Sequence, residues 1–146
     1  MTENRASRMV GGTLLAMSMF AASLTVHAEN VAEDVKVTLT GSEEVPAVTT
    51  EARGEGKITI AADKSVSGTV TTTGVEGVAA HIHLAERGKN GPAVITLTKG
   101  ADGSWSTPAG ARLTDEQYQA FKAGRLYINV HSARHKSGEI RGQLQP

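Results

Sequence analysis

The chain has 146 residues, a length that fits one domain. It contains no cysteine, which excludes disulfide bonds, thiolate metal ligands and thiol catalysis. Its 15 lysine and arginine residues balance its 15 aspartate and glutamate residues, so bulk charge does not favour binding to nucleic acid or to an anionic membrane.

The N-terminus has the layout of a secretory signal peptide. Arg5 and Arg8 form a basic region, residues 9–26 are uncharged and mostly apolar, and Ala28 ends a stretch that suits the cleaving peptidase. Glycine, serine and threonine dilute the apolar run, which favours cleavage over a transmembrane anchor. We therefore expect residues 1–28 to be a cleaved signal peptide. Residues 29–146 would be a single exported domain, periplasmic or secreted, with no membrane contact after cleavage.

Short segments in which apolar and polar residues alternate dominate the remaining chain. In chain order they cover residues 35–40, 57–60, 65–73, 81–84, 93–98, 126–131 and 139–144. Turn residues separate them, most clearly at 62–64, 88–92 and 100–103. This pattern predicts an all-β fold, namely an antiparallel sandwich or barrel with Greek-key-like connections.

One short helix is expected near residues 115–123. Thr114 is a good N-cap residue, and Gln117 stands three positions later, which together make a capping box. Gly124 is well suited to end the helix, because glycine readily adopts the left-handed conformation found there. The helix would lead directly into the strand at 126–131.

Histidines carry the clearest chemical pattern. His81 and His83 are two residues apart on one predicted strand, so both side chains point to the same face. His131 lies on the polar face of the 126–131 strand. Sets of imidazoles suit copper and zinc better than calcium or magnesium. We therefore predict a metal site with His81, His83 and His131 as ligands, copper being the first choice and zinc the second.

Other polar residues are expected around this site. Asn129 shares a face with His131, while Glu139 and Arg141 lie on the polar face of the last strand. If the three strands are neighbours in one sheet, these residues form one surface patch. Asn129 and Arg141 would then support the ligands, and His135 or Glu139 would be the candidate for a further ligand.

Several motifs, in the same order, resemble the CHRD domain, a module first named from chordin. They are LTGSEEVP at 39–46, AAHIH at 79–83, GKNGP at 88–92, AGRLYINVHS at 123–132 and GEIRGQL at 138–144. The resemblance covers about Val35 to Gln145 and implies an all-β, exported or extracellular domain without an agreed biochemical role. The characteristic histidines of the family correspond to His81, His83 and His131, with Asn129, Glu139 and Arg141 as companions. The chain departs from the usual pattern at His135 and Lys136, where many members have Asn-Pro.

The histidine pattern is also similar to the metal site of copper–zinc superoxide dismutases. Those enzymes use a His-x-His strand pair, a later strand histidine and an arginine beside the metal, but their disulfide and zinc-bridging loop have no counterpart here. Three functions follow. The first is an exported copper- or zinc-binding protein, and the second is a superoxide dismutase-like enzyme with Arg141 as anion guide. The third is a structural or protein-interaction module without metal, whose partner the sequence does not name. The sequence favours a non-enzymatic role.

Overall fold

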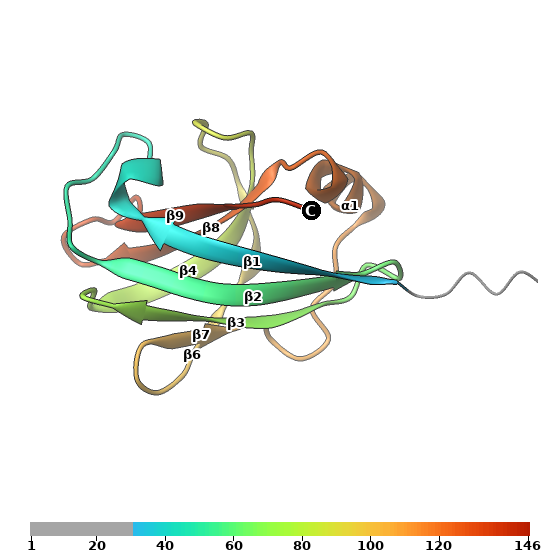
Figure 1. Cartoon of the computed structure of the whole chain (residues 1–146), viewed down its shortest axis with the longest axis horizontal. Helices are drawn as coiled ribbons and strands as arrows, with labels where there is room; N and C mark the ends of the chain where they lie inside the picture. Colours follow the sequence, from blue (N-terminus) through green and yellow to red (C-terminus); the bar gives the residue numbers. More distant parts are fainter. Residues whose placement is uncertain (1–30) are drawn as a thin grey trace, which may run out of the picture.

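The computed structural model describes residues 31–146, so the predicted signal peptide lies outside the described residues. Nine strands and one α-helix follow one another along this part of the chain (Figure 1). The strands are β1 Ala32–Thr40, β2 Arg53–Ala61, β3 Val66–Thr73, β4 Gly77–Leu84, β5 Ala93–Thr96, β6 Thr98–Lys99, β7 Ser104–Ser106, β8 Leu126–Ser132 and β9 Ile140–Leu144. The helix α1 is Asp115–Lys122, and a 3-10 turn at Gly41–Glu43 follows β1.

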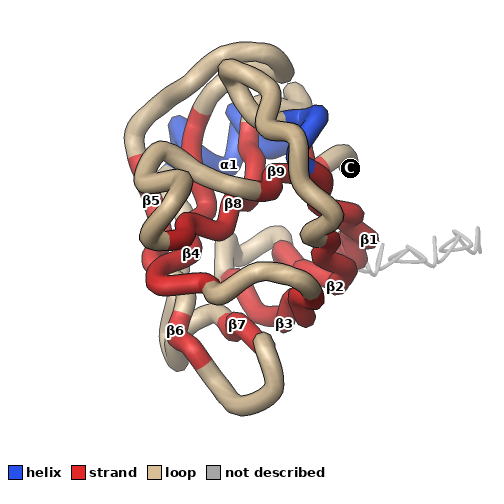
Figure 2. Tube along the Cα trace, turned by 90° about the vertical axis from the view of Figure 1, so that its left-hand side faces the viewer, coloured by secondary structure: helices blue, strands red, loops and turns tan. Residues whose placement is uncertain are grey.

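All the strands belong to one antiparallel sheet that is almost closed on itself. Their order across the sheet is β5-β4-β8-β9-β1-β2-β3-β7-β6. The two end strands, β5 and β6, are consecutive in the chain and only Leu97 separates them. Since the chain passes directly from one edge of the sheet to the other, the strands form a ring in the end view (Figure 2). The prediction of an antiparallel, barrel-like fold with one short helix is confirmed.

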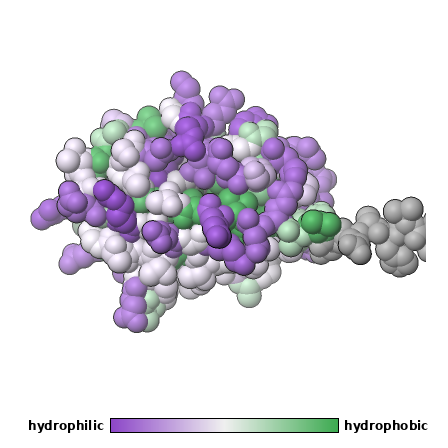
Figure 3. All heavy atoms as spheres, viewed as in Figure 1, coloured by the Kyte–Doolittle hydropathy of each residue, from purple (hydrophilic) through white to green (hydrophobic). Residues whose placement is uncertain are grey.

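The interior of the barrel is filled by the apolar residue of each alternating pair. Val35, Val37 and Leu39 of β1 are buried, whereas Lys36 and Thr38 between them are exposed. Trp105 and Phe121 are the aromatic members of a core cluster that is otherwise rich in Val, Ile and Leu. Burying apolar surface is worth roughly 25 cal/mol per Å². On the face drawn in Figure 3, hydrophilic residues predominate over the strands.

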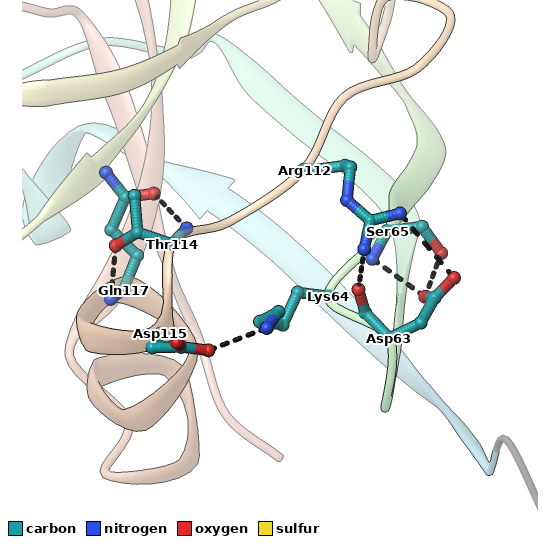
Figure 4. A network of polar contacts seen from close by, with 7 residues as sticks. All are labelled: Asp63, Lys64, Ser65, Arg112, Thr114, Asp115 and Gln117. Atoms are coloured by element: carbon teal, nitrogen blue, oxygen red, sulfur yellow. Dashed lines mark hydrogen bonds and ion pairs between the residues drawn. The ribbon is translucent and has the colours of Figure 1, made fainter.

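Helix α1 starts where the sequence predicts and covers one end of the barrel. Thr114 Oγ1 accepts a hydrogen bond from Gln117 N, and Gln117 Oε1 accepts one from Thr114 N, so the capping box is complete (Figure 4). Lys64 in the β2–β3 turn donates to Asp115 at 2.6 Å. Phe121 anchors the helix, because its side chain is fully buried in the core. A cap of this kind is worth about 1 kcal/mol.

Two sequence predictions about the sheet are wrong. Residues 93–98 do not form one strand, because the chain turns from β5 into β6 at Leu97, whose N–H donates to Ala80 O. The polar face of β8 and β9 is not at the surface either. Asn129, Arg141 and Gln143 are all less than 9% exposed, since the loops at 44–52 and 85–92 lie over them. The sequence also did not predict the short strand β7 at Ser104–Ser106. No helix within residues 31–146 is long and apolar enough to cross a membrane.

Candidate metal centre

The sheet places the three predicted ligands together because β4, β8 and β9 are adjacent strands. Across the β4–β8 pair, His81 is opposite Asn129, His83 is opposite Tyr127 and Ala79 is opposite His131. Across the β8–β9 pair, Asn129 is opposite Arg141. The three strands are therefore neighbours, which is the condition for their polar side chains to come together.

The imidazoles of His81, His83 and His131 converge on one point outside the sheet. His81 Nδ1 and His131 Nε2 are 3.0 Å apart, and one ring nitrogen from each of the three residues lies within 4.8 Å of the others. Two ligands at 2.0–2.1 Å from a tetrahedral ion are about 3.3 Å apart. All three side chains are half-buried. The cluster could therefore hold a metal once ring nitrogens as much as 4.8 Å apart draw together to about 3.3 Å.

Backbone carbonyls fix two of the rings in a ligand-like orientation. His83 Nδ1 lies 2.9 Å from Gly91 O, and His131 Nδ1 lies 2.8 Å from Lys136 O. Because a carbonyl oxygen can only accept, each Nδ1 carries the proton and each Nε2 keeps its lone pair. Metal-binding histidines in proteins are oriented in the same manner. Gly91 can approach only as a glycine, since a Cβ there would meet Leu84 O at 1.9 Å.

One nitrogen of the cluster is buried. His83 Nε2 is shielded from solvent and makes no hydrogen bond of good geometry within residues 31–146, and the Asn129 side chain is the polar group that interacts with His83 beside it. Leaving a buried acceptor unsatisfied costs about 1–3 kcal/mol. Burial lowers the pKa of His83, an effect that its bond to Gly91 O opposes. Burial also lowers the pKa of His81, with further contributions from His131 and His83. Both rings are therefore neutral near pH 7, the form that binds metals.

Tyr127 and Arg141 form a stack behind His83. The Tyr127 ring is parallel to the His83 ring, with centroids 4.8 Å apart. The guanidinium carbon of Arg141 lies 3.4 Å from the Tyr127 ring centre, and Nη1 donates to Asn90 Oδ1. Arg141 is only 1% exposed, and Nη2 donates to Lys89 O. Its charge does not face solvent beside the histidines, which argues against the predicted role of Arg141 as an anion guide.

Glu44 is a buried acid near the cluster that sequence reasoning missed. It is 6% exposed. It packs closely with Asn129 around Gly138, since a Cβ added at this glycine would lie 2.3 Å from Glu44 Oε1 and 2.5 Å from Asn129 Nδ2. Burial raises the pKa of Glu44 to about 7, against the opposing effects of Arg141 and Asn129. Its place in the LTGSEEVP motif is the one signal that could have pointed to it.

The two candidates for a further ligand lie outside the cluster. In the part of the chain that the structure describes, the ligand group consists of His81, His83 and His131 alone. Glu139 Oε1 instead accepts a hydrogen bond from Thr50 at 2.9 Å. His135 occupies the turn after β8, where its backbone N–H donates to Ser132 Oγ. Asn129 does lie next to the ligands, since its side chain interacts with His83.

The fold and the site together define a small antiparallel β-barrel that carries a three-histidine cluster on its outer face. A family model described as the CHRD domain matches residues 35–144, and the chain belongs to the CHRD domain family. No curated protein matches the chain. No solved structure matches it either.

Proposed function

We propose that this CHRD domain is an exported metal-binding protein whose His81, His83 and His131 hold a copper ion, with zinc as the second choice. The observation that carries the proposal is the convergence of one ring nitrogen from each of His81, His83 and His131, among which His83 Nε2 is buried and lacks a hydrogen bond of good geometry. A metal ion would satisfy this lone pair, whereas a proton is disfavoured there by burial. The donor set supports the same reading, because neutral imidazoles suit copper and zinc.

Copper is preferred over zinc on general affinity. Nitrogen-donor sites bind Cu²⁺ more tightly than the other divalent first-row ions. Three protein ligands leave one coordination position of a four-coordinate ion for water or another small ligand. Binding, buffering or delivery of the ion needs no further group. Export rests on the sequence of residues 1–28, and N-terminal sequencing of protein recovered outside the cytoplasm would test it.

Calorimetric titration of the purified protein with Cu(II) and Zn(II) tests the proposal. We expect one ion per chain with Kd below micromolar, and at least a 100-fold loss of affinity in His83→Ala. His135→Ala is the matched control, since this histidine lies outside the cluster, and it should bind like the wild type. Binding weaker than micromolar in the wild type, or equal binding by His83→Ala, would contradict the proposal.

A purely structural role is the alternative that the 3.0 Å contact between His81 and His131 favours. In that case the contact is a hydrogen bond that joins β4 to β8. His131→Ala would then lower the melting temperature, and added metal would change the melting temperature of neither protein. A ligand at 100 times its Kd stabilises the folded state by about 2.7 kcal/mol. A clear rise in melting temperature with copper, lost in His131→Ala, therefore decides against the structural alternative.

A further inference from the structure

Glu44 occupies a position that the proposed metal site does not yet explain. It follows the 3-10 turn Gly41–Glu43, and its side chain is buried against Asn129 and Gly138. Its Oε1 atom is shielded from solvent and makes no hydrogen bond of good geometry among the described residues, and the carboxyl group interacts with the Asn129 side chain and the backbone of Val45. A carboxyl group is rarely buried in this way unless a charge nearby compensates it.

Asn129 connects Glu44 to the histidine cluster. Its Nδ2 donates to Ser137 O at 3.2 Å, which fixes the amide, and its side chain interacts with both Glu44 and His83. Asn129 also lies in one cross-strand row with His81 and Arg141. Asn129 therefore lies between Glu44 and the ligand histidines. Charges interact more strongly in this protein interior than in water.

Arg141 supplies a positive charge on the same side of the cluster. Its guanidinium donates to two neutral acceptors, Asn90 Oδ1 and Lys89 O, and none of the ion pairs within residues 31–146 involves it. Arg141 acts on both Glu44 and His83 electrostatically. A cation bound by the histidines would be repelled by Arg141 and attracted by an ionised Glu44.

We infer that Glu44 is the counter-charge of the histidine cluster, whose carboxylate enables His81, His83 and His131 to hold a divalent ion beside the buried guanidinium of Arg141. The inference rests on the proposed function. Coulombic interactions scale with the charge of the ion, so removal of the carboxylate affects a divalent ion about twice as strongly, on a logarithmic scale, as a monovalent one. Glu44 thus favours Cu(II) over Cu(I) at the site.

The test compares the affinities of Cu(II) and Cu(I) in the purified protein, measured by competition with chromophoric chelators. Glu44→Gln keeps the shape of the side chain and removes its charge. We expect a loss of about 30- to 100-fold for Cu(II), within the range seen when groups supporting metal ligands are removed. For Cu(I) we expect about 5- to 10-fold, which is half of that effect on a logarithmic scale. Glu44→Asp keeps the charge and should retain the wild-type ratio of the two affinities. Glu51→Gln, at an exposed glutamate, is the matched control.

The outcomes separate the inference from the proposed function. If the wild type binds neither ion, the proposed function fails. If the wild type binds and Glu44→Gln loses nothing, or loses equally for both ions, the inference fails, because a merely structural role would weaken both alike. If Glu44→Gln does not fold, isotope-edited infrared spectra of the wild type can be used instead to follow the protonation of glutamate carboxyl groups. Zinc addition should then convert a protonated carboxyl band of glutamate into a carboxylate band, and an unchanged band would overturn the inference.

Discussion

The rings of His83 and Tyr127 stack face to face across the β4–β8 pair, with centroids 4.8 Å apart and planes within 5° of each other. Arg141, from the strand on the other side of β8, lies over the same tyrosine. A ligand histidine, an aromatic ring and a guanidinium are thus packed as one unit. This packing keeps His83 from rotating away from His81 and His131.

The stack predicts that the ring of Tyr127 matters more than its hydroxyl group. Tyr127→Phe removes only a long hydrogen bond from Gly91 N, so stability should fall by less than about 1 kcal/mol and copper affinity should remain within threefold. Tyr127→Leu removes both aromatic contacts and should cost about 1–3 kcal/mol, with roughly tenfold weaker copper binding. Urea denaturation and metal titration measure both effects. Equal behaviour of the two variants would show that the stack does not position His83.

We predict that the side chain of Asn90 holds the 85–92 loop in place over the site. Its Oδ1 accepts from Arg141 and its Nδ2 donates to Val45 O, so it joins the two loops that cover β8 and β9. The next residue, Gly91, provides the carbonyl that orients His83. Asn90→Ala should therefore lower copper affinity about 10- to 100-fold while the circular dichroism of the sheet stays unchanged.

Lys89→Ala is the control for Asn90→Ala, because Lys89 contributes only its backbone carbonyl to Arg141. It should bind copper like the wild type. If both variants bind equally well, the orientation of His83 does not depend on the Asn90 contacts.

The raised pKa of Glu44 predicts that the stability of the metal-free protein depends on pH. Burial raises its pKa from 4.5 to about 7, so between these values the folded state holds a proton that the unfolded state has released. The contribution of Glu44 is complete below about pH 4.5 and is lost as the pH rises through 7, by at most about 3 kcal/mol. Glu44→Gln cannot ionise and should lack this decline. Urea denaturation at pH 5 and pH 8 measures the difference, and parallel behaviour of variant and wild type would contradict the assignment.

The part of the site that lies on strands could be predicted from the sequence. His81 and His83 are two residues apart, and the polar phase of β8 assigned His131 to the outer face, because the period of a strand is two. The capping box of Thr114 and Gln117 is equally local. Such features depend on neighbours along the chain and therefore survive in any tertiary context.

The part of the site that lies in loops could not be predicted. Glu44 and Asn90 resemble ordinary turn residues, and only tertiary packing places them over β8 and β9. Because this packing buries Asn129 and Arg141, a polar row expected at the surface became an interior layer. Alternation distinguishes the two faces of a strand, but it does not indicate whether a loop covers the polar one.

The central claim is that His81, His83 and His131 share one metal ion, and anomalous diffraction from copper-loaded crystals tests it most directly. The account predicts a single strong copper peak about 2.0–2.1 Å from His81 Nδ1, His83 Nε2 and His131 Nε2, with Gly91 O and Lys136 O still bound to the opposite nitrogens. A peak that lacks His83, or copper only at exposed histidines such as His135, would contradict it.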